Sequence, residues 1–383
     1  MSDGKANPDV VVIGAGAFGA WTALSLIERG ARVLLVDAFG PGNHIGSSGG
    51  ESRNIRAAYG ERDIYTRWAI RAWDLWQARE QAFGVRLLYP SGSLRVLSSG
   101  EMAIQLTVFD QLGQPCEALT SADVRRRWPQ VAYRDDSPIF YEPKSGVLAA
   151  RDGLVAVVNH FQALGGSYRC ARIDPPTSPA RKLASIQIDG AAVSAGTFVF
   201  ACGPWLPRLF PDVLGRHIKT PRRELFFLGP APGDTRFDWQ HCPSLADPLG
   251  WTSPDIGGGV KFAPVIRHVP MDPDEGSRMP TPALLDQVRA YAASRLPELV
   301  ERPVVASYVS QLENSDNEHF IIDRHPMLAD VVIAGGGSGH AFKMGPVIGE
   351  HVAGLVLDDL QDAALTAIFG IATHGPVAAD QGG

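Results

Sequence analysis

The sequence predicts an α/β protein in which a domain with a parallel sheet is interrupted twice by a second, α+β domain with a mainly antiparallel sheet. Three observations predict this fold. A strand, glycine turn, helix and second strand follow one another from Asp9 to Asp37, and a strand, glycine loop and helix recur from about residue 329. Between these patterns lie two stretches of short strand-like runs. With 383 residues, 45% of them hydrophobic, the chain can bury the cores of roughly two domains.

The first pattern is a dinucleotide-binding fingerprint, which makes the parallel-sheet domain Rossmann-like. Gly14 permits a tight turn after an apolar strand, Gly16 lets a pyrophosphate approach the backbone, and Gly19 lets the helix lie close to the strand. The free N–H groups at the start of the helix then face the phosphates. Asp37 ends the second strand, where an acid can accept hydrogen bonds from an adenosine ribose. The fingerprint indicates a bound dinucleotide, but it does not separate FAD from NAD.

The middle of the chain alternates between the two domains. A polar, glycine-rich segment from Gly40 to Gly50 leads toward a predicted helix with three tryptophans, Trp68, Trp73 and Trp76, which we expect in the core. Short strands and a charged helix follow, and then a long helix and two strands return to the first domain. We therefore assign residues 1–84, 141–208 and 313–383 to the dinucleotide-binding domain and residues 85–140 and 209–312 to the second domain.

A second glycine loop lies near the end of the sequence. Gly335, Gly336, Gly337 and Gly339 follow an apolar strand and precede a helix opened by Pro346. The start of that helix is another place for negative charge, because its N–H groups carry partial positive charge. The alternative is a glycine-rich loop with a packing role only.

Composition narrows the class of protein further. The net charge of −6 and pI near 5.9 disfavour a broad nucleic-acid or anionic-membrane surface. The first nine residues are polar and the long apolar runs are interrupted, so we expect a cytoplasmic protein with no secretory signal and no membrane span. The residues from 374 onward look like a frayed tail. Neither the four scattered cysteines nor the histidines show metal-ligand spacing, so we expect no metal.

A resemblance to a known family rests on four sequence blocks, VVVIGAGAFGAW, HIGSSGGESRNIRAAYGE, GGGVKFAPVIR, and NEHFIIDRHP with VVIAGGGSGHAFKMGPVIGE. The chain resembles the monomeric sarcosine oxidase and N-methyltryptophan oxidase branch of the D-amino-acid-oxidase-like flavoproteins over nearly its whole length. That resemblance implies FAD, a dinucleotide domain with a substrate domain, and oxidation of an amine beside a carboxylate.

The resemblance also assigns roles to residues of this chain. Arg53 and Arg56 match two arginines that lie beneath or beside the flavin, and Arg56 with Lys343 also matches the pair that holds the substrate carboxylate. Lys261 matches a lysine near flavin N5 that assists dioxygen reduction, so Lys261 and Arg53 are the catalytic candidates. Trp251 and Leu312 fall at substrate-pocket positions. The expected cofactor contacts are Gly14, Gly16, Gly19, Asp37, Ser47, Ser52, Arg53, Ile173, Gly337, Gly339, His340 and Lys343.

Several positions depart from the family pattern. Ser310 stands where many relatives have the cysteine that forms a thioether with the flavin, and a hydroxyl cannot replace a thiolate there, so we expect FAD to be bound without a covalent link. Leu312 and Trp251 fall at or near pocket tyrosines, and Val265 falls where sarcosine oxidases have a pocket histidine. These changes predict a more apolar pocket that suits a bulkier N-substituted, cyclic or aromatic amino acid.

We therefore expect a monomeric FAD-dependent oxidase of an amino acid or N-substituted amino acid. Hydride transfer to flavin N5 would give the imine, and dioxygen would be reduced to hydrogen peroxide. One alternative is a dehydrogenase of the same fold with a quinone or protein acceptor. Another is a non-catalytic, dinucleotide-binding regulatory protein, which the presence of Arg56, Lys261 and Lys343 together disfavours.

Overall fold

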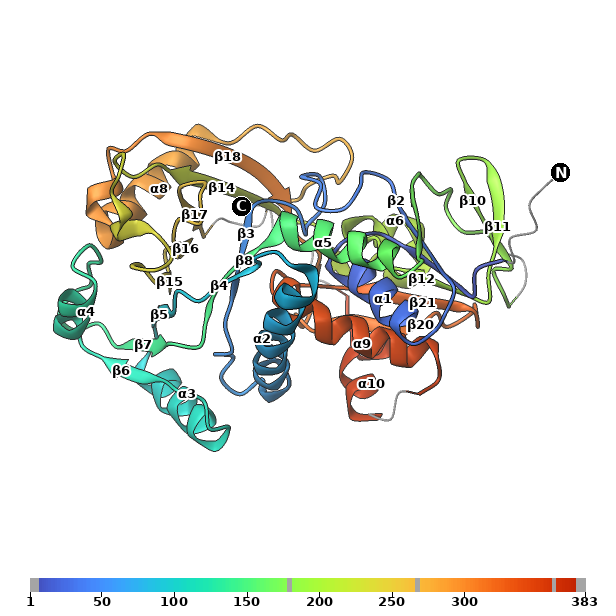
Figure 1. Ribbon diagram of the computed structural model, residues 1–383, viewed down its shortest axis with the longest axis horizontal. Coiled ribbons are helices and arrows are strands. Elements are labelled where there is room, and N and C mark those ends of the chain that lie inside the picture. The colour runs from blue at the N-terminus through green and yellow to red at the C-terminus, as the bar shows by residue number, and fades with distance from the viewer. Residues whose placement is uncertain (1–6, 178–180, 266–268, 360–362, 377–383) are drawn as a thin grey trace.

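Two large sheets organise the protein, with a small sheet between them (Figure 1). The computed structural model describes residues 7–177, 181–265, 269–359 and 363–376, so most of the tail expected to fray lies outside the described residues. The parallel sheet is on the right in Figure 1 and the antiparallel sheet on the left. None of the described helices is long and apolar enough to cross a bilayer.

The first large sheet is the predicted Rossmann-like sheet. Its six strands lie in the order β20 (Ile321–Arg324), β21 (Val331–Gly335), β12 (Thr197–Phe200), β1 (Val10–Ile13), β2 (Val33–Asp37) and β9 (Ser167–Cys170). All neighbouring strands are parallel except β20 and β21. The carboxyl ends of β1, β2 and β12 therefore meet at one edge, where ligands bind in open α/β sheets.

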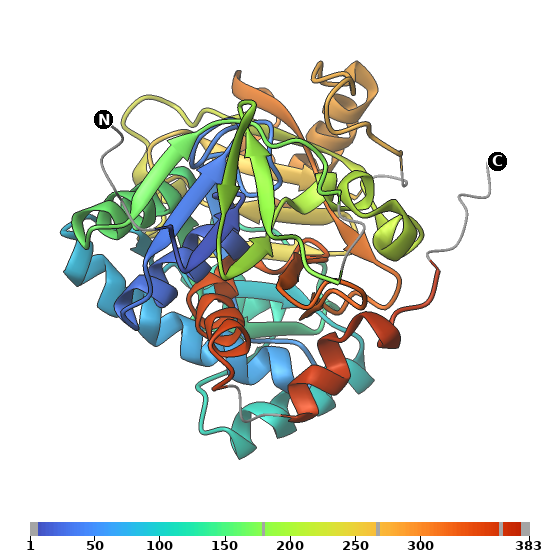
Figure 2. The ribbon, with the colours of Figure 1, turned by 90° about the vertical axis from the view of Figure 1, so that its right-hand side faces the viewer.

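Hydrophobic side chains alternate across this sheet, as the strand period of two requires. Val10 and Val12 pack in one cluster with the helices, whereas Val11 and Ile13 pack on the opposite side. There they meet a hairpin of β10 (Ser185–Ile188) and β11 (Ala191–Ser194), which is yellow-green and in front of the sheet in Figure 2. The helices are α1 (Ala17–Glu28), α2 (Asp63–Phe83), α5 (Ala150–Ala163) and α9 (Gly345–Val356).

The three tryptophans predicted in the core are buried there, which confirms the prediction. Trp68, Trp73 and Trp76 lie on α2. Trp76 meets Trp21 of α1 edge-on, with 5.1 Å between the ring centroids. Its indole N–H also donates to the backbone carbonyl of Lys343 at 2.7 Å. Core packing therefore holds the turn that carries Lys343.

The second large sheet is mainly antiparallel and comes from two separate stretches of chain, as predicted. Its strands lie in the order β18 (Val304–Gln311), β14 (Arg222–Leu228), β17 (Val260–Pro264), β16 (Gly250–Ser253), β15 (Ser244–Asp247), β5 (Ser93–Val96), β7 (Ile139–Glu142) and β6 (Glu117–Leu119). Only β15 and β5 pair in parallel. One face packs on α8 (Pro282–Arg295) around Phe226, Leu245 and Tyr291. Within the described residues, the opposite face of this sheet does not pack on α8.

The small sheet of β3 (Ser52–Ile55), β8 (Gly146–Ala149) and β4 (Leu88–Tyr89) links the two large ones. Asn54 of β3 donates to the carbonyl of Thr252 at 3.0 Å and accepts from the Ser253 hydroxyl at 2.6 Å, both on β16. The domain limits expected from the sequence stay a prediction. The smaller elements are α3 (Ser99–Gln111), α4 (Ser121–Arg127), α6 (Leu206–Leu209), α7 (Pro211–Leu214), α10 (Ala363–Phe369), β13 (Ile218–Lys219) and β19 (Asn314–Ser315).

Gly19→Ala should destabilise the protein, because a Cβ on Gly19 would lie 1.8 Å from the carbonyl oxygen of Gly14. Backbone atoms cannot move aside without distorting the turn after β1, so we expect a loss of about 2 kcal/mol or more in the free energy of unfolding. Gly100→Ala on α3 is the control, since nothing lies within 4 Å of its added Cβ, and it should gain up to about 1 kcal/mol. Urea unfolding measures both. Unchanged stability of Gly19→Ala would contradict the close packing of helix and strand.

Candidate active site

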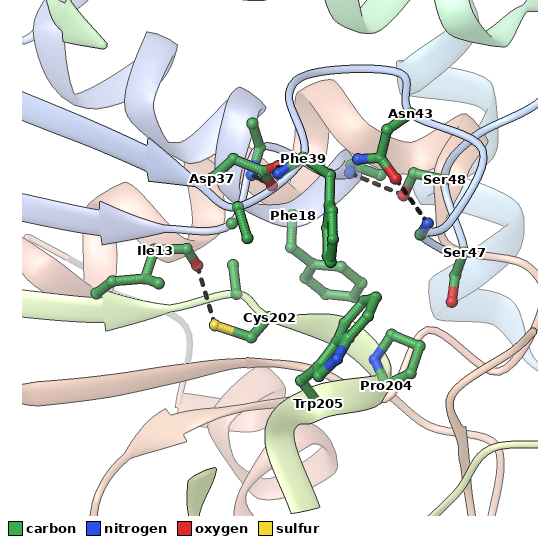
Figure 3. A pocket seen from close by; sticks show the side chains of 18 of the residues that line it. Ile13, Phe18, Asp37, Phe39, Asn43, Ser47, Ser48, Cys202, Pro204 and Trp205 are labelled. Carbon is green, nitrogen blue, oxygen red and sulfur yellow. Dashed lines mark hydrogen bonds between the residues drawn. The ribbon is translucent and has the colours of Figure 1, made fainter. Parts of the chain in front are cut away.

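A first cavity of about 980 Å³ opens where β1, β2 and β12 end and α1 begins. Figure 3 shows Phe18, Asp37, Phe39, Ser48 and Trp205 around it. Five of the predicted cofactor contacts line this cavity, namely Gly14, Gly16, Asp37, Ser47 and Ile173. The dinucleotide fingerprint therefore surrounds a cavity at the edge of the parallel sheet where ligands bind in open α/β sheets.

The three glycines of the fingerprint have different structural roles. Gly14 has a φ of +104°, and a Cβ on it would lie 2.3 Å from the carbonyl oxygen of Ala201. Gly16 faces the cavity, where the Ser48 hydroxyl accepts from the N–H of Ala17 at 3.0 Å. Gly19 does not line the cavity and instead packs on Gly14. The remaining N–H groups of the first helical turn are the ones that a phosphate can accept from.

Asp37 also orders the surrounding loops. Its carboxylate accepts the N–H of Ala15 at 2.7 Å and those of Phe39 and Gly40 at 2.8 Å each. A carboxylate has roughly four acceptor positions. Asp37 therefore keeps about one position for a ribose hydroxyl while holding together the turn after β1 and the loop after β2.

A second cavity of about 1,100 Å³ continues from the first, because the two share five lining residues, Ala17, Phe18, Ser47, Ser48 and Glu313. It lies against the start of α1, the second glycine loop and the open face of the antiparallel sheet. Besides Ser47, the sequence-predicted residues that line it are Arg53, Arg56, Trp251, Leu312, Gly337, Gly339, His340 and Lys343. The structure thus brings the predicted substrate contacts to one place.

The cationic side chains of this site are held by backbone carbonyls. Arg53 donates to the carbonyls of Ser47 at 2.8 Å and Gly49 at 2.5 Å, and Lys343 donates to that of His340 at 2.9 Å. Arg56 donates to the carbonyl of Ala58. Among the described residues, no carboxylate oxygen lies within 4.0 Å of the charged nitrogens of Arg53, Arg56 or Lys343. A carbonyl dipole fixes a cation in place without cancelling its charge.

Lys261 lies behind the wall of the second cavity. Its side chain is 1% exposed, and its Nζ donates to the backbone carbonyl of Ser52 at 2.6 Å. The Trp251 ring, which does line the cavity, has its centroid 5.0 Å from this nitrogen. Burial and nearby Arg53 lower the pKa of Lys261 well below its usual value. Ser52, a predicted cofactor contact, is likewise absent from the lining of both cavities.

Ser310 and Val265, two positions at which the sequence departs from the family pattern, lie in different surroundings. Ser310 is buried on β18, and its hydroxyl donates to the carbonyl of Gln311 at 3.5 Å; it lines neither cavity. Val265 was expected in the pocket, and that expectation is wrong. Its side chain is 59% exposed just beyond the end of β17 at Pro264, and it does not line the second cavity. Trp251 and Leu312 alone supply the apolar substitutions in the cavity.

Sequence reasoning missed several polar residues of the second cavity. Arg95 on β5 donates to the same Ala58 carbonyl as Arg56, at 2.7 Å. Ser93 and Glu313 also line the cavity. None of these three lies in a recognisable motif. The alternation of Ser93 and Arg95 around buried Leu94 was the only signal that they share a strand face.

Two buried atoms indicate that a ligand belongs across the junction of the cavities. The Ser47 hydroxyl and one carboxyl oxygen of Glu313 have no partner in the described chain, and both residues line both cavities. Such unsatisfied groups are rare in native proteins. Burial raises the pKa of Glu313 to about 7, although backbone N–H groups of Gly337 and Gly336 oppose the rise. An elongated ligand with hydroxyl and phosphate groups, such as FAD, fits these residues.

Glu142 is a buried acid close to the cationic groups but outside the cavity lining. It accepts the N–H of Ala57 at 2.6 Å, and its other oxygen has no partner in the described chain. Burial raises its pKa to about 7, although the Ala57 N–H, Arg56 and Arg95 act in the opposite direction. Glu142 therefore neutralises the nearby guanidinium groups only in part at neutral pH.

Comparisons with known proteins confirm the resemblance inferred from the sequence blocks. The sequence profile of the FAD dependent oxidoreductase family matches residues 9–355. Monomeric sarcosine oxidase from Streptomyces avermitilis is 29% identical over 362 residues, which cover 91% of this chain and 93% of that protein. N-methyl-L-tryptophan oxidase from Yersinia pestis is 26% identical over 383 residues, covering 95% and 98%.

Solved structures show the same fold. L-proline dehydrogenase from P. horikoshii superposes with a TM-score of 0.85 at 18% identity, covering 95% of this chain and 97% of that one. NikD, described as an unusual amino acid oxidase essential for nikkomycin biosynthesis, gives 0.79 at 21% identity in its open form, covering 98% and 99%.

Glu142 should make stability depend on pH. Its folded-state pKa of about 7 exceeds its ordinary 4.5, so the folded protein holds this proton more tightly than the unfolded chain. This contribution is fully present below about pH 4.5 and is lost as pH rises through about 7. Relative to Glu142→Gln, which does not titrate, the wild type should lose about 2 kcal/mol of unfolding free energy from about pH 5 to 8. Urea unfolding across this range measures it, with exposed Glu301→Gln as control. Parallel pH profiles of wild type and Glu142→Gln would refute the assignment.

Proposed function

Because the chain belongs to the FAD dependent oxidoreductase family, we propose that it is an oxidase of N-substituted amino acids, N-methylated or cyclic, with dioxygen as electron acceptor. Its sequence relatives include a sarcosine oxidase and an N-methyl-L-tryptophan oxidase. The observation that carries the proposal is the set of carbonyl-held cationic side chains in the second cavity. A carboxylate distinguishes an amino acid from a simple amine, and these groups suit a carboxylate.

FAD would extend through both cavities. Gly14, Gly16 and the start of α1 would hold the pyrophosphate, and Asp37 would accept a ribose hydroxyl. The second glycine loop, the Ser47 hydroxyl and Arg53 would contact the rest of the cofactor. When bound, FAD supplies the acceptor for two electrons from the amine and transfers them to dioxygen. Ser310 offers no thiolate, so the proposal includes a non-covalent cofactor. The monomeric state and cytoplasmic location stay predictions.

Arg56 and Lys343 would bind the substrate carboxylate. Arg56 offers a planar fork of donors and Lys343 a point charge. Both lie over the ring of Tyr59, at 4.8 and 5.3 Å from its centroid, which limits their motion. Burial and Arg56 lower the pKa of Lys343, and a bound carboxylate would oppose this and favour the ammonium. Trp251 and Leu312 would provide apolar walls for the rest of the substrate.

The same charges favour a neutral substrate amine, the form that can give up electrons to an acceptor. Nearby cations disfavour a protonated amine, as they do any second positive charge. His340 does not add to these charges, since burial and Lys343 lower its pKa to about 3. Its ring is held between the Tyr59 hydroxyl at 3.3 Å and the carbonyl of Glu318 at 3.0 Å.

Lys261 would act in the reaction with dioxygen. A buried ammonium stabilises negative charge that forms on dioxygen, and such preorganised groups are most effective where water is excluded. Its Nζ donates to the carbonyl of Ser52, the residue before Arg53, and Arg53 lines the second cavity. Developing negative charge would also counter the effect of burial on the pKa of Lys261.

The proposed function is tested by anaerobic mixing of the FAD-loaded protein with N-methyl, cyclic and D-amino acids, followed by air. A substrate should remove the visible flavin absorbance, and air should restore it with an equimolar yield of hydrogen peroxide. Reduction without peroxide would indicate a dehydrogenase with another acceptor. Failure of every amino acid to reduce the flavin would indicate a non-catalytic protein.

Loss of either carboxylate anchor should weaken turnover of amino acids. Arg56→Ala and Lys343→Ala should each lower kcat/KM by a factor equivalent to about 2 to 5 kcal/mol, since a desolvated charge then lacks its partner. The methyl ester of a substrate should suffer a similar loss in the wild type. Steady-state kinetics measure both effects, with Arg134→Ala, whose side chain is 82% exposed, as the control. Equal turnover of acid and ester would defeat the assignment.

Lys261→Met should slow one half-reaction and largely spare the other. Removal of the ammonium should slow reoxidation by dioxygen roughly a hundredfold or more, the effect of losing one preorganised electrostatic donor. Anaerobic flavin reduction should change much less. Stopped-flow spectroscopy measures the two steps separately, with Lys144→Met, on the surface, as control. Normal reoxidation in the FAD-loaded Lys261→Met protein would make Lys261 a structural residue.

Acid or heat denaturation should release intact FAD into the supernatant, because Ser310 cannot form a thioether. The absorbance and chromatography of the supernatant measure the released cofactor. Flavin that remains with the precipitated polypeptide would show that another side chain carries a covalent link.

A further inference from the structure

We propose that Arg95 binds a second anionic group of the substrate, so that the enzyme prefers amino acids bearing a carboxylate besides the one next to the amine. The inference rests on the proposed function and names its substrate class. It concerns the part of the second cavity formed by β5, β15 and β16, beyond the pair Arg56 and Lys343.

Strand register places Arg95 on the sheet face that carries the rest of the site. Arg95 pairs with Ala246, and Ala246 pairs with Trp251 on the next strand. Paired residues point to the same face of a sheet. Lys261 pairs with Ser253, two residues after Trp251, and so lies on that face as well. From β5 to β17 there are three strand spacings, about 14 Å, with Trp251 between.

The cavity holds more positive charge than one carboxylate requires. Arg56 and Arg95 donate to the same carbonyl, that of Ala58, so two like charges converge on one acceptor. Arg56, and secondly burial, lower the pKa of Arg95 to about 9, which still leaves it cationic at neutral pH. Within the described chain, no carboxylate oxygen lies within 4.0 Å of either guanidinium. An anion bound at Arg95 would relieve this repulsion.

Ser93 supplies an independent indication of a ligand. Its hydroxyl is buried and has no partner in the described chain, yet the residue lines the second cavity. Ser93 and Arg95 are two residues apart on β5, so their side chains lie on one face about 7 Å apart. A hydroxyl and a guanidinium are complementary to a carboxylate. Ala246 and Trp251 offer apolar surface on which the methylene groups between two carboxylates can lie.

The test uses carboxylates that have no amine to oxidise. Glutarate and adipate are compared with pentanoate and hexanoate, in which a methyl group replaces one carboxylate, on the FAD-loaded protein, and dissociation constants are read from the shift of the flavin spectrum and from thermal stabilisation. The wild type should bind one of the dicarboxylates about 30-fold or more tightly than its monocarboxylate partner, the ratio equivalent to about 2 kcal/mol.

Variants separate an anion site from a structural arginine. Arg95→Met should abolish the preference for the dicarboxylate, Arg95→Lys should keep part of it, and Ser93→Ala should reduce it. Arg134→Met, an exposed arginine, should leave it unchanged. Equal loss of both ligand classes in Arg95→Met would overturn the inference, because Arg95 would then only hold the Ala58 carbonyl. Equal binding of both classes by the wild type would overturn it too.

The two proposals fail in different ways. If dicarboxylates bind through Arg95 but no amino acid reduces the flavin, the proposed oxidation fails and the anion site stands. If N-substituted amino acids with one carboxylate reduce the flavin as efficiently as those with two, the oxidase stands and the inference about Arg95 is wrong.

Discussion

The arrangement of the site depends on cationic side chains whose hydrogen-bond acceptors are backbone carbonyls and not protein carboxylates. Surface arginines of this protein pair with acids, as Arg236 does with Asp234 and Glu298. In the second cavity Arg56 and Arg95 share the carbonyl of Ala58 instead. A buried charge is costly unless it is paired, and a carbonyl reduces this cost only in part. The site therefore keeps positive charge available for an anionic ligand.

This arrangement requires segments that are distant in the chain to meet with precise backbone positions. The parallel sheet presents the start of α1, the antiparallel sheet presents Arg95 and Trp251, and the small sheet presents Arg53. Close packing of Gly19 on Gly14 brings α1 to the first cavity. The hydrogen bond from Trp76 to the Lys343 carbonyl couples the other end of the site to the helical core.

Local patterns in the sequence predicted the parts of this structure that local physics decides. The fingerprint around Gly14, the two sheet types and the buried tryptophans follow from glycine geometry and from hydrophobic periodicity. The sequence did not predict Arg95 as a site residue, because its position in the cavity depends on the parallel pairing of β5 with β15, which lies far along the chain. Val265 was misplaced because its position was taken from the resemblance to the family, although Pro264 is the kind of residue that ends a strand. Glu313 looked like an ordinary acid, and only its burial at the junction of two cavities shows otherwise.

The most direct test of this account is a crystal structure of the FAD-loaded protein with bound glutarate, which cannot be oxidised. In that structure we expect Arg56, Arg95 and Lys343 to keep their backbone carbonyl partners and one carboxylate to lie within hydrogen-bonding distance of Arg56 and Lys343. A structure in which protein carboxylates such as Glu142 pair with these side chains, and glutarate binds elsewhere, would contradict it.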